Sequence, residues 1–179
     1  MHYHPDRLPA GLDLNPIAMH YFVPQRPYLV PNGVQASLVE LDPDSGIVRP
    51  LRHWVVEDCG RVINPLLVDE QIRGGVVQGL GGALLEECRY DERGQLQTST
   101  LADYLVPMAT DMPDIVVDHV STPVEGTILG VKGVGEAGTV GAAAALLNAV
   151  NDALQPFGAT VCETPCTPER ILRALKRVP

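Results

Sequence analysis

The sequence predicts an α+β fold in which antiparallel hairpins pack against glycine-rich helices. Two β-type runs, residues 35–41 and 48–56, flank a turn-rich loop at 42–46, which is the pattern of a hairpin. An apolar helical pattern that is dense in glycine follows at 66–86. Strands and helices do not alternate along the chain as they do in a doubly wound parallel sheet, so we expect separate hairpins and helices.

The N-terminal segment differs in composition from the rest of the chain. Residues 1–33 hold six of the 16 prolines and show no clear apolar period. This pattern predicts an extended arm and not a folded unit. Residues 34–179 are then the folded part, and the whole chain of 179 residues has the size of one domain that can bury a core.

The helix predicted at 66–86 carries five glycines between positions 74 and 82. Each glycine costs about 0.8–1 kcal/mol relative to alanine inside a helix, so something must approach this backbone closely, either another helix or a ligand. Gln71 and Gln78 are seven residues apart and therefore lie on one face. For Gln78, a ligand contact and an ordinary helix contact both remain open.

The predicted elements after this helix are less regular. A weaker hairpin is predicted at 88–98, and a strand is predicted at 115–120. A short C-terminal helix is expected at 167–176, because Thr167 suits the N-cap position and Pro168 suits the first helical position.

Glu136 lies in a glycine-dense turn that leads directly into an alanine-rich helix ending near Leu154. Such a backbone can lie against a ligand with no Cβ in the way, and the first amides of the helix point into the turn. A carboxylate desolvated there would have a raised pKa, which suits a general base. The alternative is an acid that only favours the dipole of the helix.

A dinucleotide site is a competing interpretation of the same turn. Gly133, Gly135 and Gly138 spell GxGxxG, the fingerprint of a NAD-binding module. However, Glu136 would put a carboxylate where a pyrophosphate should sit, and no further βα units follow. We therefore rank this interpretation third.

Charge and cysteine content exclude several classes of function. The net charge is −9 and there is no run of Lys or Arg, which argues against nucleic acid and anionic membranes as partners. Since no membrane-length apolar run or signal peptide is present, we expect a cytoplasmic protein. The cysteines and histidines form no convincing metal set, and we expect buried free thiols at the four cysteines, Cys59, Cys88, Cys162 and Cys166.

Three blocks of sequence resemble a known family. They are Asp-Cys-Gly-Arg-Val-Ile-Asn-Pro at 58–65, Gln-Ile-Arg-Gly-Gly-Val-Val-Gln-Gly-Leu-Gly at 71–81, and Lys-Gly-Val-Gly-Glu at 132–136. In order and spacing they resemble the C-terminal end of the molybdopterin-binding large subunit of the molybdenum hydroxylases. This family includes xanthine dehydrogenases, aldehyde oxidases and aerobic carbon monoxide dehydrogenases. The resemblance covers roughly residues 20 to 175, and three ordered blocks are far more specific than one.

The resemblance implies a role for each site residue. It makes Glu136 the general base beside molybdenum, in an oxidation of a small organic substrate at an electron-poor carbon with water as the oxygen source. It implies that Gln71 contacts the pterin, with Gln78 on the same face. It also implies that the backbone of the glycine turn flanks the cofactor at Gly133, Val134 and Gly135.

The resemblance also implies partners, because the family's large subunit is several times longer than this chain. The chain is therefore expected to be a fragment or a split subunit that is inactive alone and binds the cofactor poorly. The expected cofactor is molybdopterin with molybdenum, in its cytosine dinucleotide form. The expected partners are the remainder of the large subunit, an iron–sulfur subunit and a flavin (FAD) subunit in an oligomer. The alternative is a non-catalytic assembly domain, and the substrate cannot be inferred.

Overall fold

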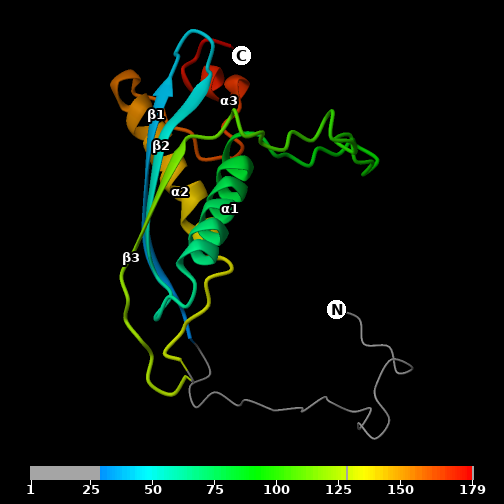
Figure 1. The fold of residues 1–179 in the computed structure, drawn as a ribbon. Coiled ribbons are helices and arrows are strands. Elements are labelled where there is room, and N and C mark those ends of the chain that lie inside the picture. Colours follow the sequence, from blue (N-terminus) through cyan, green and yellow to red (C-terminus); the bar gives the residue numbers. More distant parts are fainter. Residues whose placement is uncertain (1–28, 128, 179) are drawn as a thin grey trace, which may run out of the picture.

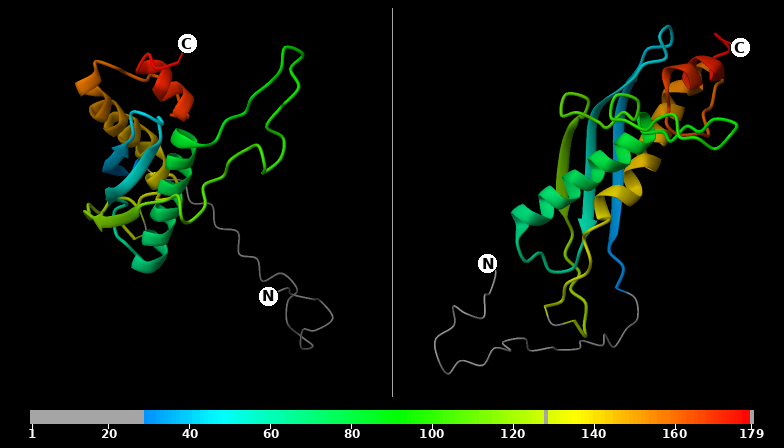
Figure 2. Two further views of the ribbon diagram at one scale, coloured as in Figure 1. Left: turned by 90° about the horizontal axis from the view of Figure 1, so that it is seen from above. Right: turned by 90° about the vertical axis from the view of Figure 1, so that its right-hand side faces the viewer.

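The computed structural model describes residues 29–127 and 129–178. A three-stranded sheet forms one layer, and the two long helices cover one of its faces (Figures 1 and 2). In chain order the elements are β1 (Asn32–Leu41), β2 (Val48–Asp58), α1 (Pro65–Leu84), β3 (Asp114–His119), α2 (Ala137–Leu154), the 3₁₀ helix η2 (Gln155–Phe157) and α3 (Pro168–Ala174).

The predicted first hairpin is confirmed. β1 and β2 pair antiparallel, with Asn32 opposite Asp58 and Leu41 opposite Val48. In the connecting loop Asp42 accepts hydrogen bonds from the Asp44 amide at 3.0 Å and the Ser45 hydroxyl at 2.6 Å. These bonds close the turn locally, as expected for Asp and Ser at such positions.

The sheet is mixed and not built from hairpins alone. The strand predicted at 115–120 is β3, at Asp114–His119, and it pairs parallel with β2. The second hairpin predicted at 88–98 is wrong in extent, because only an isolated bridge joins Tyr90 and Leu96. Most side chains of that segment are exposed, so no buried face stabilises a longer ladder.

The glycines of α1 bring a second helix close, as one of the two predicted explanations requires. A Cβ at Gly138 of α2 would clash with the Ile72 carbonyl, and a Cβ at Gly79 would lie 2.7 Å from Ala142 Cβ. In contrast, a Cβ at Gly74 or Gly82 would meet nothing within 4 Å in the described structure. Only part of the glycine content of α1 therefore serves this helix contact.

The core lies between the helices and the inner face of the sheet. Its fully or almost fully buried members include Val55, Ile72, Val76, Leu80, Ala142, Leu146, Val150, Leu154 and Ile171. The opposite face of the sheet has no covering element within the described residues. Its apolar members, paired across the strands, are Val34, Ala36, Leu38, Trp54, Val56 and Val116.

The outcome of the remaining predictions is mixed. The Thr167 hydroxyl caps α3 by accepting from the Arg170 amide, and Pro168 is the first residue of the helix. Of the predicted arm, residues 1–28 lie outside the described residues, and β1 already begins at Asn32. Cys59 and Cys166 are buried free thiols, but Cys88 and Cys162 are exposed, so that expectation holds for two of the four. No helix in the described ranges is long and apolar enough to cross a membrane.

Candidate active site around the glycine turn

Asp58, at the end of β2, ties the first block of sequence to the third. One oxygen of its carboxylate accepts from the Gly60 amide at 2.9 Å and the Thr122 amide at 3.0 Å. The other accepts from Lys132 Nζ at 2.8 Å, and both side chains are nearly buried. The hydrogen bond from Lys132 holds the pKa of Asp58 well below its ordinary value.

Backbone contacts extend this junction. The Lys132 amide donates to the Cys59 carbonyl at 2.8 Å, and the Arg61 amide donates to the Gly130 carbonyl at 3.1 Å. Gly60 has a φ of +72°, and a Cβ there would clash with the Gly130 carbonyl. Glycine is thus required at position 60 both for its backbone angle and for the close approach of the turn.

The second block reaches the same turn from α1. Gln71 Nε2 donates to the Gly135 carbonyl at 3.0 Å. The Thr139 hydroxyl, in the first turn of α2, lies 3.2 Å from Gln78 Oε1 and 3.1 Å from the Gly75 carbonyl. The three blocks that lie apart in the sequence therefore meet at residues 130–139.

Glu136 is the last residue before α2. Its side chain is exposed, makes no capping hydrogen bond, and has no hydrogen-bond partner among the described residues. The desolvated pocket expected from the sequence is thus not formed by this part of the chain. The alternative, an acid that only favours the helix dipole, stays open, because Glu136 lies at the N-terminus of α2.

The backbone on either side of Val134 is open. A Cβ at Gly133 or at Gly135 would meet nothing within 4 Å in the described structure. The half-buried side chain of Val134 packs against the core, which leaves the neighbouring glycines exposed. Gln71 Oε1 and Gln78 Nε2 also lack a hydrogen-bond partner within the described ranges.

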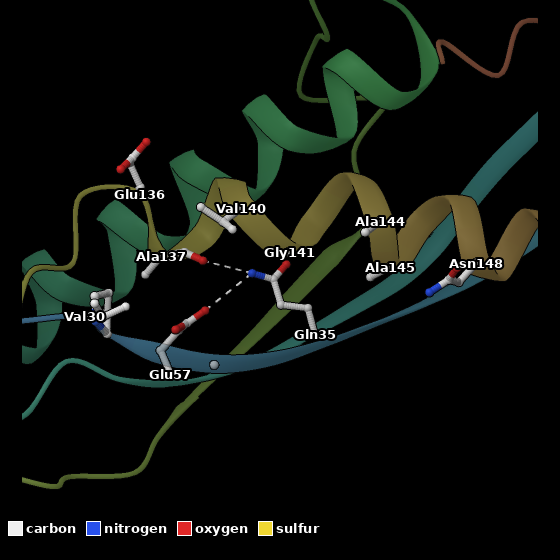
Figure 3. Close-up of a pocket in the computed structure, with 12 residues that line it drawn as sticks. Val30, Gln35, Glu57, Glu136, Ala137, Val140, Gly141, Ala144, Ala145 and Asn148 are labelled. Carbon is white, nitrogen blue, oxygen red and sulfur yellow. Dashed lines mark hydrogen bonds between the residues drawn. The ribbon is translucent and has the colours of Figure 1, made fainter. Parts of the chain in front are cut away.

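A groove runs along α2 next to this turn, between β1 and the helix. Its volume is about 450 Å³, and its polar lining consists of Gln35, Glu57, Glu136 and Asn148, with glycine and apolar residues making up the rest. Figure 3 shows the Gln35 amide pointing at α2 within the groove, and the Glu136 carboxylate pointing away from both Gln35 and Glu57.

Sequence reasoning missed three polar side chains that face the helices from the sheet. They are Gln35 on β1 and His53 and Glu57 on β2. Burial raises the pKa of Glu57 and lowers that of His53. The strand period could have revealed them, because polar residues at inward positions of a hairpin break the expected apolar alternation.

The conditions for a dinucleotide site are not met in the described structure. The fingerprint needs a strand before the glycines and a second strand after the helix. Only an isolated bridge at Val131 precedes the turn, and residues 159–161 form no strand.

Comparison with known proteins assigns the chain to a family. The family model described as "Molybdopterin cofactor-binding domain" matches residues 17–113. The nicotine 6-hydroxylase large subunit of Paenarthrobacter nicotinovorans is 50% identical over 147 residues, which is 82% of this chain and 18% of that relative. The chain belongs to the molybdopterin cofactor-binding domains of molybdenum hydroxylase large subunits.

Solved structures agree with this assignment. Quinoline 2-oxidoreductase from Pseudomonas putida 86 superposes with a TM-score of 0.81 at 45% identity, over 84% of this chain and 19% of that one. Carbon monoxide dehydrogenase from Oligotropha carboxidovorans gives a TM-score of 0.78 at 31% identity, over 82% of this chain and 18% of that one. The predicted α+β class and the family resemblance are confirmed. This molybdopterin-binding domain thus spans about a fifth of the length of its relatives.

Residues of this molybdopterin-binding domain fit a large polar cofactor at the turn. The backbone at Gly133 and Gly135 is open, Gln71 contacts Gly135, and Gln78 contacts Thr139 three residues after Glu136. Glycines that allow close backbone approach and amides that both donate and accept suit the polar edges of a pterin.

Proposed function

We propose that this chain is the C-terminal part of the large subunit of a molybdenum hydroxylase, and that Glu136 is its general base. The observation that carries the proposal is that the three sequence blocks meet at one turn. The carboxylate of Glu136 at this turn forms no hydrogen bond with any described residue. A carboxylate with a purely structural role in the core would instead be paired with a hydrogen-bond donor.

The reaction proposed is RH + H₂O → ROH + 2 H⁺ + 2 e⁻ at an electron-poor carbon of a small organic substrate. The molybdenum cofactor, when bound, supplies the two-electron oxidation. Glu136 accepts a proton from the water-derived oxygen as the C–O bond forms. The remainder of the large subunit would exclude water around this carboxylate, which is exposed in the chain by itself.

The cofactor would be held along the turn. Gln71 has a free carbonyl oxygen that can accept from the pterin, and Gln78 has a free amide nitrogen that can donate. The backbone at Gly133, Val134 and Gly135 would lie against the cofactor. We propose the cytosine dinucleotide form, as the resemblance implies.

The partners follow from the length of the relatives. The remainder of the large subunit would cover the bare apolar face of the sheet, since this chain supplies about a fifth of such a subunit. Electrons released at the site would leave through an iron–sulfur subunit and a flavin subunit, which the family resemblance and not the length implies.

A reconstitution experiment tests this function. The chain is expressed with the remainder of a large subunit, and with the iron–sulfur and flavin subunits, in a host that makes the cofactor. Molybdenum content and dye reduction are then measured with nicotine, quinoline and carbon monoxide, the compounds named in its relatives. We expect both signals only when the chain is present, and N-heterocycles as the better substrates, given the higher identities of those relatives. Assembly without molybdenum or turnover would replace the proposal with a non-catalytic docking domain.

A further inference from the structure

A chain of hydrogen bonds runs from the sheet to the first turn of α2. Ser37 Oγ lies 2.8 Å from Nδ1 of His53, whose side chain is fully buried. His53 Nε2 lies 3.1 Å from Gln35 Oε1. Gln35 Nε2 in turn donates to the carbonyl of Ala137 at 3.0 Å (Figure 3). It also donates to the carbonyl of Gly138 at 3.1 Å.

The donors and acceptors available fix the direction of every hydrogen bond in this series. Because the two helix carbonyls can only accept, the amide nitrogen of Gln35 must face them, and its carbonyl oxygen must face His53. His53 therefore donates from Nε2 and accepts from the Ser37 hydroxyl at Nδ1. Such a neutral tautomer agrees with the full burial of the ring.

The helix leaves space for this amide. A Cβ at Gly141 would lie 2.9 Å from Gln35 Cδ and 3.1 Å from its Nε2, so a side chain there would displace the glutamine. Gln35, which is partly buried, also has a weaker contact at 3.4 Å with the buried carboxyl of Glu57.

Two glutamine side chains bind the backbone on either side of Glu136. Gln71 of α1 binds the carbonyl of Gly135, the residue before it, and Gln35 of β1 binds the carbonyl of Ala137, the residue after it. The Glu136 side chain itself has no partner among the described residues, so the direction of its carboxylate depends on how this backbone is held.

We propose that Gln35, with its orientation set by His53 and Ser37, is the positioning residue for Glu136. Its hydrogen bonds hold the first turn of α2 from the side of the sheet, and they thereby fix the position of the Glu136 carboxylate. This inference rests on the proposed role of Glu136 as the base. A small displacement of a base lowers the rate of the chemical step while leaving substrate binding largely intact.

The test uses the complete, cofactor-loaded enzyme with Gln35→Met, which keeps the length of the side chain but removes the donor and the acceptor. We expect kcat to fall by about tenfold or more, with molybdenum content and KM little changed. Gln95→Met, in the exposed loop at 88–98, is the matched control and should leave kcat unchanged.

A double-mutant cycle separates positioning from a general structural effect. If Gln35 acts through Glu136, Gln35→Met lowers kcat in the wild-type background and has no further effect in a Glu136→Gln background. An equal fall in both backgrounds, or unchanged kcat in the single variant, would overturn the inference. If Glu136→Gln alone leaves kcat unchanged, the proposed role of Glu136 as the base is wrong. This outcome is distinct from the outcomes that contradict only the role of Gln35.

If Gln35→Met does not assemble, Ser37→Ala takes its place in the same cycle. This variant removes only the donor that sets the tautomer of His53 and leaves the glutamine present. We expect kcat to fall about threefold in the wild-type background, with no fall in the Glu136→Gln background. Unchanged kcat in the wild-type background would overturn the inference.

Discussion

Asp58 and Lys132 join the end of β2 to the glycine turn through a nearly buried ion pair. The carboxylate also receives two backbone amides, so its lone pairs are well satisfied. A buried pair with these extra hydrogen bonds is costly to break, because one charge would be left without a partner. The pair therefore holds the turn that carries Glu136 in place.

We expect Lys132→Met to lower the free energy of unfolding of the chain by about 1.5–3 kcal/mol at neutral pH. Since the pKa of Asp58 is lowered, the contribution of the pair is present above the ordinary value of 3.8 and is lost as the pH falls below it. The difference from wild type should thus shrink in acid. Urea unfolding at pH 7 and pH 2.5 checks this. Arg49→Met, which breaks an exposed pair with Glu40, should change stability by less than about 1 kcal/mol.

Glu57 has the opposite dependence on pH. Burial raises the pKa of its carboxyl above the ordinary value of 4.5, so the folded chain holds this proton more tightly than the unfolded chain. Its contribution to stability therefore falls as the pH rises from 4.5 through the folded pKa. We expect Glu57→Gln to gain stability relative to wild type between pH 4 and pH 8, as measured by urea midpoints. An equal effect at both pH values would contradict this expectation, and Glu40→Gln, on the exposed side of β1, is the control.

At the level of elements, the close packing of α1 against α2 depends on particular glycines and not on the number of glycines. Gly138 meets the backbone of α1, whereas Gly74 faces open space in the described structure. Two alanine substitutions in neighbouring helices should therefore act in opposite directions.

We expect Gly138→Ala to destabilise the chain by about 1–3 kcal/mol, because the added Cβ must push the helices apart. Gly74→Ala should stabilise it by about 0.4–1 kcal/mol, because the helix interior gains propensity without a clash. Thermal unfolding of the two variants in parallel checks both signs. Equal effects of the two substitutions would show that the helix contact is not what these glycines serve.

The elements with strong local patterns were predictable from the sequence. The hairpin of β1 and β2, both long helices and the cap of α3 follow from apolar period and turn chemistry. The parallel pairing of β3 with β2 did not, because partners far apart in sequence leave no local signal. Residues 88–98 have turn chemistry without a buried face, so the predicted hairpin is reduced to a single bridge.

The site was predictable in part, because its residues lie in recognisable sequence blocks and not because of a local structural pattern. Its residues came from the three blocks, whose contacts explain their ordered spacing. Gln35 and His53 lie outside the blocks, and only the paired register of the hairpin brings them to the start of α2. The exposure of Glu136 was not predicted, because a glycine turn in the sequence does not show which other segments pack against it.

At the scale of the whole molecule, one face of the sheet has no covering layer in the described structure. Its apolar members come from all three strands, and Val34 is 75% exposed. A surface of this kind favours association, either with the remainder of the large subunit or with a second copy of the chain. The cytoplasmic location stays a prediction from the sequence.

We expect Val56→Lys, on the central strand of this face, to prevent assembly with the remainder of the large subunit while leaving the fold of the chain intact. Co-purification and circular dichroism together check this outcome. Glu92→Lys, in the exposed loop at 88–98, should assemble normally. Normal assembly of Val56→Lys would mean that the partner binds elsewhere.

The most direct test of the account is the rate at which substrate reduces the complete enzyme in a single anaerobic turnover, with Glu136→Gln compared at equal molybdenum content. The account predicts a fall of about 100-fold or more, because a glutamine cannot accept the proton. Glu92→Gln, an exposed glutamate in the loop at 88–98, should react at the wild-type rate. A Glu136→Gln enzyme that is reduced within a factor of about three of wild type would contradict the assignment of Glu136 as the base.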